Sequence, residues 1–198
     1  MNWTSRLRSY VGMSLAEVSV VLSVGGVLAS VAAPAIGDYI AEARYNKARQ
    51  DTSVIASAFA RFTGDVVEQS ARDGGWATYQ LLAGGGTVPA LGSGGDGAWL
   101  ASDEAGVGSL DTQLVTNTAG YGVGPWRQVN PRRGWHGPYV QAGIGPDPWG
   151  RRYAINVGGS GNILVLSAGP NGLVETAFNG NAIVPGGDDI AATVTSSR

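Results

Sequence analysis

The stretch RSYVGMSLAEVSVVLSVGGVLASVAAPAI, residues 8–36, decides the fold because it joins a long apolar run to a single carboxylate near its start. From Val18 to Ile36, 19 residues carry no formal charge. At about 1.5 Å per helical residue this block spans about 28 Å, close to the roughly 30 Å hydrocarbon core of a bilayer. One membrane-spanning helix is therefore predicted, and the position of Glu17 needs an explanation.

Three interpretations of this segment compete. A cleaved secretory signal would use Arg6 and Arg8 as its basic region and APA, residues 33–35, as its cleavage site, but its apolar region should be only about 7 to 15 residues long. An uncleaved signal anchor leaves Glu17 as a cost of roughly 2.5 to 3.5 kcal/mol if it lies deep in the bilayer. A cut between Gly12 and Met13 instead creates an α-amino group that can attract Glu17, in the same chain or in a neighbouring copy.

The order Gly12, Met13, Ser14, Leu15, Ala16, Glu17 resembles the signature of type IV prepilins. In that family a glycine precedes the cut, the first mature residue is hydrophobic, and glutamate stands at mature position five. Residues 1–12 are similar to the short basic leader, and Pro34 falls where the family commonly has a proline. Met13 stands where the family usually has phenylalanine.

The resemblance implies a role for each of these residues. A prepilin peptidase would cleave between Gly12 and Met13, and Met13 would be N-methylated. Glu17 would neutralise the terminal amine of an adjacent subunit during assembly. Pro34 would allow either a static kink or local melting of the helix when the subunit enters the filament, because proline removes a backbone donor.

The helical pattern continues beyond the membrane block, so we expect residues 13–36 to form a membrane and assembly half and residues 37–63 an amphipathic half. One helix from about Met13 to Thr63 is predicted, with Gly64 as its C-cap. The apolar face expected to pack on a globular domain consists of Val54, Ile55, Ala58, Phe59 and Phe62.

Residues 64–135 are rich in glycine and are interpreted as a variable surface insertion. Short helices or strands are expected near residues 76–82 and 110–115. The segment AGGGT, residues 83–87, lacks the lysine and the strand-to-helix context of a phosphate loop. A net charge of −2 gives no basic field for nucleic acid, and the absence of cysteine excludes disulfides and thiolate metal sites.

Residues 136–198 form the predicted β region. DPWGRRYAINV and GNILVLSAG read as two strands joined by a turn at 158–161. The blocks GPY, DPWGRRY, SAGPNG and GGDDI resemble the C-terminal domain of the major pseudopilin of type II secretion systems. The expected fold class is α+β, with a long N-terminal helix packed on a small antiparallel sheet that carries Gly-rich loops.

A calcium site in the final loop is also an expectation. Adjacent carboxylates at Asp188 and Asp189 favour a hard cation in a Gly-rich setting, although the same pair could simply cap a turn. The pseudopilin resemblance adds Ser167 and Asn171 as ligands. Asn171 stands where the family usually has aspartate, and Glu175 is a candidate replacement ligand.

The resemblance implies a non-enzymatic subunit of a type II secretion pseudopilus. Its partners would be copies of itself, the prepilin peptidase, minor pseudopilins and an inner-membrane assembly platform. The chain would cross the bacterial inner membrane once, with a periplasmic C-terminal domain, and would then enter a periplasmic filament. A type IV pilin or minor pilin of a surface filament, for adhesion, motility or DNA uptake, is the alternative.

A membrane-anchored periplasmic enzyme is the hypothesis from a different class. Its candidate residues are His136, the only histidine, with Asp147 and Ser167. Three tryptophans, Trp126, Trp135 and Trp149, could line a sugar-binding groove or serve as core anchors.

Overall fold

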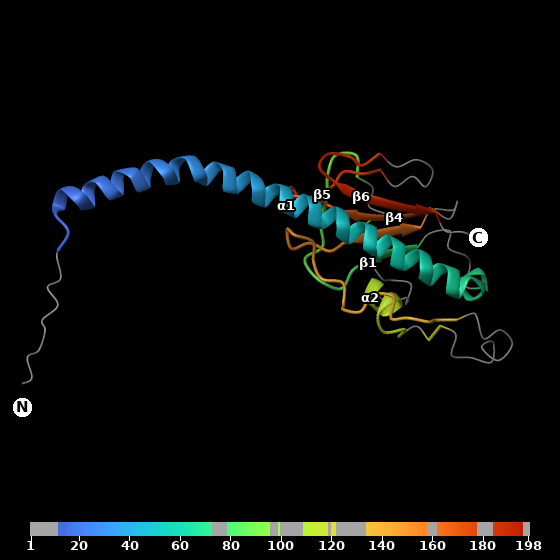
Figure 1. Cartoon of the computed structure of the whole chain (residues 1–198). Coiled ribbons are helices and arrows are strands. Elements are labelled where there is room, and N and C mark those ends of the chain that lie inside the picture. Colours follow the sequence, from blue (N-terminus) through green and yellow to red (C-terminus); the bar gives the residue numbers. More distant parts are fainter. Residues whose placement is uncertain are drawn as a thin grey trace, which may run out of the picture. The chain divides into compact units, whose positions relative to one another are not determined.

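The computed structural model describes residues 12–72, 79–95, 99, 109–118, 120–121, 134–157, 162–177 and 184–195. The chain divides into two compact units, Met1–Glu42 and Ala43–Arg198. The elements, shown in Figure 1, are α1 (Leu15–Arg72), β1 (Tyr79–Leu82), β2 (Ala90–Leu91), α2 (Leu110–Leu114), β3 (Ala154–Val157), β4 (Asn162–Ser167), β5 (Leu173–Val174) and β6 (Ile190–Thr195).

The second unit is built around a four-stranded antiparallel sheet in the order β1-β3-β4-β6. A separate pair of short strands, β2 and β5, is parallel. The predicted hairpin of β3 and β4 is confirmed by its antiparallel register, in which Ile155 lies opposite Val165. Its turn at 158–161 lies outside the described residues. The expected α+β class, with a long helix on a small antiparallel sheet, is confirmed.

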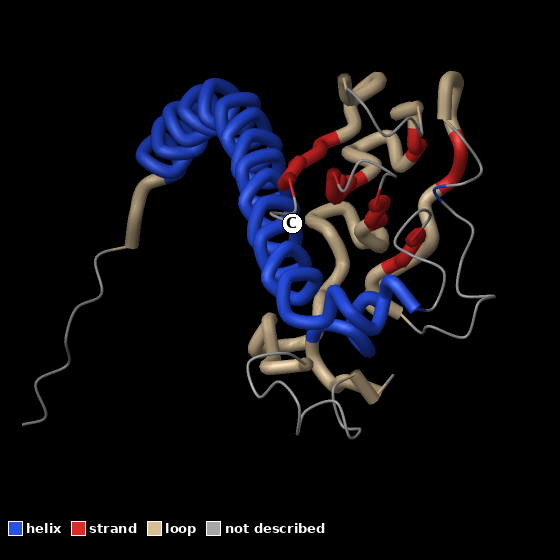
Figure 2. The backbone as a smooth tube through the Cα atoms, turned by 90° about the vertical axis from the view of Figure 1, so that its right-hand side faces the viewer, coloured by secondary structure: helices blue, strands red, loops and turns tan. Residues whose placement is uncertain are grey.

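The part of α1 that belongs to the second unit covers one face of this sheet. Figures 1 and 2 show the helix alongside the strands. Phe59 and Phe62 of α1 are fully buried in one cluster with Ile155, Ile163 and Val165 of the sheet. Burial of this stripe is the main force that docks the helix, since each fully buried large apolar side chain contributes roughly 1.5 to 3 kcal/mol.

The opposite face of the sheet is also covered, by a second cluster. Leu164 and Leu166 of β4 belong to this second cluster, whereas Ile163 and Val165 belong to the first, because successive strand residues face opposite sides. Trp99, from the Gly-rich region, is 1% exposed and joins the second cluster. The interpretation of the whole Gly-rich region as a surface insertion is therefore wrong at this residue, which belongs to the core.

Two details of the predicted helix are wrong. First, α1 continues through Gly64 to Arg72, and Val66, beyond the predicted end, is 3% exposed. A buried side chain two residues after the glycine extends the apolar stripe, and this packing outweighs the roughly 1 kcal/mol helix penalty of glycine. Second, Val54 is 53% exposed. The buried stripe runs through Ile55, and a residue one position earlier is rotated by 100° away from it.

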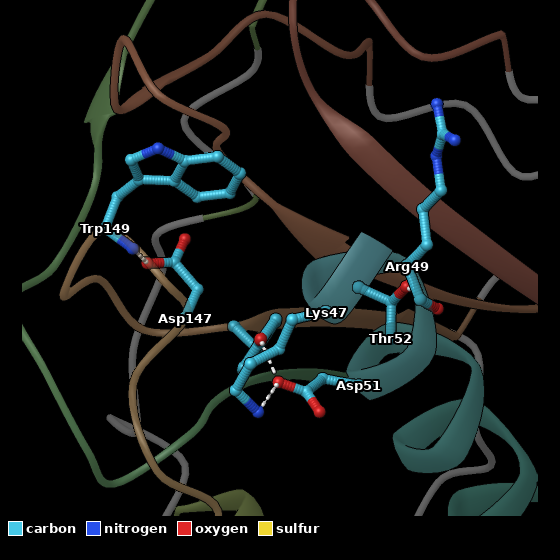
Figure 3. Close-up of polar contacts among 7 residues, drawn as sticks. Lys47, Arg49, Asp51, Thr52, Asp147 and Trp149 are labelled. Carbon is cyan, nitrogen blue, oxygen red and sulfur yellow. Dashed lines mark hydrogen bonds and ion pairs between the residues drawn. The ribbon is translucent and has the colours of Figure 1, made fainter. Parts of the chain in front are cut away.

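Side-chain contacts outside the apolar clusters also join α1 to the segment that precedes β3. Asp51 of α1 accepts hydrogen bonds from Lys47 Nζ at 2.9 Å and from the Tyr153 hydroxyl at 3.0 Å (Figure 3). The Tyr45 and Trp149 rings meet edge to face with centroids 5.4 Å apart. Burial and the neighbouring Asp51 raise the pKa of Tyr153 above its usual range, so this hydroxyl stays protonated and donates.

Candidate functional site

The first candidate site is the N-terminal end of α1. Gly12 and Met13 are exposed and lie immediately before the helix, so the bond between them is accessible. The leader apart from Gly12, residues 1–11, lies outside the described residues. The cleavage and methylation assignments therefore stay predictions.

Glu17 has partners within its own chain. Its Oε2 accepts from Ser14 N at 2.8 Å and from Ser14 Oγ at 2.9 Å, while Glu17 N donates to Ser14 Oγ at 3.3 Å. This reciprocal arrangement is a capping box, which satisfies backbone donors that the first helical turn leaves free. Sequence reasoning missed Ser14, although the Ser-x-x-Glu spacing before an apolar run is the signal for such a box.

The first unit presents a continuous apolar helix surface. Leu15 is 89% exposed and Val31 is 71% exposed, with other valines and leucines between them. Among the described residues, α1 is the one helix long and apolar enough to cross a membrane. It remains helical through Pro34. Such a surface requires lipid or another protein to cover it, which is consistent with a membrane anchor.

The three residues of the enzyme hypothesis do not all come together, because His136 is not part of the Ser167–Asp147 pair. Ser167 Oγ donates to Asp147 Oδ2 at 2.7 Å, but both side chains are buried. His136 lies elsewhere, with its Nδ1 3.7 Å from Asp65 Oδ2. The other oxygen of Asp147 accepts from the backbone N–H groups of Trp149 and Arg151, at 3.0 and 2.8 Å. Asp147 therefore shapes the turn that follows it.

The tryptophans of the same hypothesis act as anchors where the structure describes them. Trp135 donates from Nε1 to the Gln113 carbonyl at 2.8 Å and packs edge to face on Tyr139. Trp149 packs on Tyr45. Trp126 lies outside the described residues.

The second candidate site is the loop that connects β4, β5 and β6. Asn171 Nδ2 donates to Glu175 Oε2 at 3.0 Å, and Asn171 N donates to Asp188 Oδ2 at 3.0 Å. Asp189 Oδ2 accepts from the N–H groups of Glu175 and Thr176, at 2.8 and 2.7 Å, and from the Thr176 hydroxyl. Four of the predicted ligand residues therefore share one hydrogen-bonded network, whereas the hydroxyl of the fifth, Ser167, is bonded to Asp147.

Two carboxylate oxygens in this loop accept no hydrogen bond from the residues that the structure describes. Asp188 Oδ1 and Asp189 Oδ1 are both buried. Burial, opposed in part by the hydrogen bonds from Thr176 and Glu175, raises the pKa of Asp189, and the nearby charge of Asp188 raises it further. Buried oxygens without donors fit a hard cation, which also takes backbone carbonyls. Among the described residues, no three His, Cys, Asp or Glu side chains converge as metal ligands, so carboxylates alone would not complete the site.

The Gly-rich region contributes to the surroundings of this loop. Ala90 N and Gly92 N of the β2 segment donate to the carbonyls of Gly172 and Val174, at 3.1 and 2.9 Å. Trp99 Nε1 donates to the Thr176 carbonyl at 2.9 Å. These contacts were not predicted, since no local pattern in the sequence pairs residues about 80 positions apart.

Comparison with known proteins identifies the C-terminal part of the chain. Residues 125–193 match the family model described as type II secretion system (T2SS), protein G. No curated protein and no solved structure matches the chain. The matched segment includes β3, β4, β5 and most of β6, together with the Asp147 turn and the Asp188–Asp189 turn. The chain thus carries, in residues 125–193, a domain that matches protein G of the type II secretion system, a pseudopilin family.

Proposed function

We propose that this chain polymerises from the bacterial inner membrane into a periplasmic pseudopilus that helps to drive protein export. The observation that carries the proposal is the combination of a protein G domain with an exposed apolar helix headed by Glu17. In the membrane, lipid covers the helix. In the filament, neighbouring copies replace the lipid, and the same apolar side chains serve both states.

The partners follow from this route. A prepilin peptidase removes residues 1–12 and methylates Met13, and minor pseudopilins and the assembly platform start and extend the filament. Glu17 changes partners on assembly, from the Ser14 donors of its own capping box to the terminal amine of an adjacent subunit. An ammonium and a carboxylate attract strongly in the low-dielectric interior of a helical bundle.

The experiment has two parts. N-terminal sequencing and intact mass of the protein from its native membrane should give a chain that begins at methylated Met13. A chain that begins at Ile36 would instead indicate a cleaved secretory signal and would refute the proposal.

Next, Glu17→Ala should be processed and inserted normally but should yield almost no sheared filament. Asp38→Ala, which removes an exposed carboxylate from the same helix, is the matched control and should assemble. Normal filament yield from Glu17→Ala would exclude the pairing. Filaments that extend from the cell surface at native expression would favour a surface pilus.

We also propose that the loop binds calcium through Asp188 and Asp189, supported by their two buried oxygens without hydrogen bonds. Glu175 and loop carbonyls are the further oxygen donors, and the ion would supply charge that offsets carboxylate repulsion. The full-length protein in detergent should melt higher in calcium chloride than in EDTA, because a ligand of the folded state stabilises it. The double variant Asp188→Asn, Asp189→Asn should lose this rise, and an unchanged rise would remove both residues from the site.

A further inference from the structure

The positively charged guanidinium of Arg151 lies against the loop that follows β4. Its Nη1 donates to the Gly169 carbonyl at 3.3 Å and its Nη2 to the Asn171 carbonyl at 3.4 Å. Within the described part of the chain, its guanidinium makes no ion pair with a carboxylate. The side chain therefore contacts backbone carbonyls of the loop, which are the kind of oxygen that a bound cation also takes.

Gly172 makes room for this contact. A methyl group built on Gly172 would overlap the guanidinium carbon and nitrogens of Arg151. The residue also has φ of +72°, a conformation that glycine adopts without strain. Gly172 N donates to the Ala168 carbonyl at 3.1 Å, which closes the turn over residues 168–172. The guanidinium thus lies directly on the backbone of a tight turn.

The backbone of Arg151 is held firmly, so its side chain starts from a fixed position. Arg151 N donates to Asp147 Oδ1 at 2.8 Å, and its carbonyl accepts from Asp147 N at 2.8 Å. Thr87 of the Gly-rich region forms a β-bridge with it. With the backbone already ordered, only the rotamers of the Arg151 side chain must be fixed when it binds the loop.

We propose that Arg151 is a built-in cation that holds the 168–172 turn closed. The loop that carries Asn171 and Glu175 then keeps its folded shape without a divalent ion, and calcium adds to an already ordered site. Arg151 is a positioning residue in this scheme: it acts on the loop carbonyls, and it does not touch the ion. The inference does not depend on filament assembly.

Hydrogen exchange of the full-length protein in detergent tests the proposal. Wild type, Arg151→Gln, Arg151→Lys and Arg152→Gln would each be measured in EDTA and in calcium chloride. Arg152 is the matched control, because its Nε donates to the Gly86 carbonyl and not to the loop. In EDTA, Arg151→Gln should exchange about tenfold faster over residues 168–177, the factor expected for loss of one charge-assisted hydrogen bond. Arg151→Lys should retain part of the protection, and β4 should be unaffected.

The outcomes distinguish the contribution of the Arg151 guanidinium from that of calcium. Wild-type protection of residues 168–177 in Arg151→Gln would overturn the proposal, as would an equal loss of protection throughout β4. If calcium restores the protection in this variant, both the clamp and the calcium site are supported. If protection is lost and calcium does not restore it, the clamp stands and the calcium site fails.

Discussion

Replacement of Trp99 tests whether the Gly-rich region is part of the core. Trp99→Ala should destabilise the protein by about 3 to 5 kcal/mol, the usual cost of truncating a buried tryptophan. Its indole is 1% exposed, packs in the cluster with Leu164 and Leu166, and donates to the Thr176 carbonyl. For a domain of this size, 1 kcal/mol shifts the melting temperature by about 2 to 4 °C, so a fall of about 6 to 20 °C is expected.

The assay is urea or thermal unfolding of the full-length protein in detergent, followed by circular dichroism. Val88→Ala is the matched control from the same region, since Val88 is 52% exposed and should change stability by less than about 0.5 kcal/mol. Trp99→Phe keeps most of the apolar surface but loses the hydrogen bond to Thr176, so its cost should lie between the two. A cost below about 1 kcal/mol for Trp99→Ala would refute the core assignment and restore the surface interpretation.

Two further predictions concern ionisable groups. The folded-state pKa of Asp189 is raised above its unfolded value, so its contribution to stability is complete in acid and is lost as pH rises through the folded pKa. In EDTA, the melting temperature of wild type minus that of Asp189→Asn should therefore fall as pH rises above about 4, the usual pKa of an unfolded Asp, and a constant difference would contradict the raised pKa. Tyr153→Phe should cost about 1.5 to 3 kcal/mol, because its hydroxyl donates to the Asp51 carboxylate. Lys47→Ala removes only the exposed partner of Asp51 and should cost less than about 1 kcal/mol in the same unfolding assay.

The long helix and the β3–β4 hairpin could be predicted because their signals are local. The uncharged block before Gly37 and the alternating patterns of DPWGRRYAINV and GNILVLSAG can both be read over short stretches of the sequence. The end of α1 could not be placed, because the burial of Val66 depends on tertiary packing that Gly64 alone does not reveal. Short elements were expected near 76–82 and 110–115, and the structure has β1 and α2 there.

The residues of the candidate sites likewise divide into those with a local sequence signal and those that only the folded chain brings together. Glu17 was identified from spacing along one helix, and its Ser14 partner had a sequence signal that was overlooked. The contacts of Asp189 with Glu175 and Thr176 required a folded chain, since these residues lie 14 and 13 positions from Asp189. Arg151 reaches the loop from 18 and 20 residues away, and no local pattern distinguishes it from Arg152.

The two faces of the four-stranded sheet pack against different apolar clusters. Side chains of β3 and β4 that face α1 pack with Phe59 and Phe62, while those on the other face pack with Trp99 and Val174 of β5. The Gly-rich region reaches both surfaces, because Leu110, Leu114 and Tyr121 pack in the cluster with Phe59 and Phe62, while Trp99 packs on the other face. Substitutions at Tyr121, whose ring centroid lies 5.4 Å from that of Phe62, can therefore alter the packing of the helix directly, whereas substitutions at Trp99 act on the opposite face of the sheet.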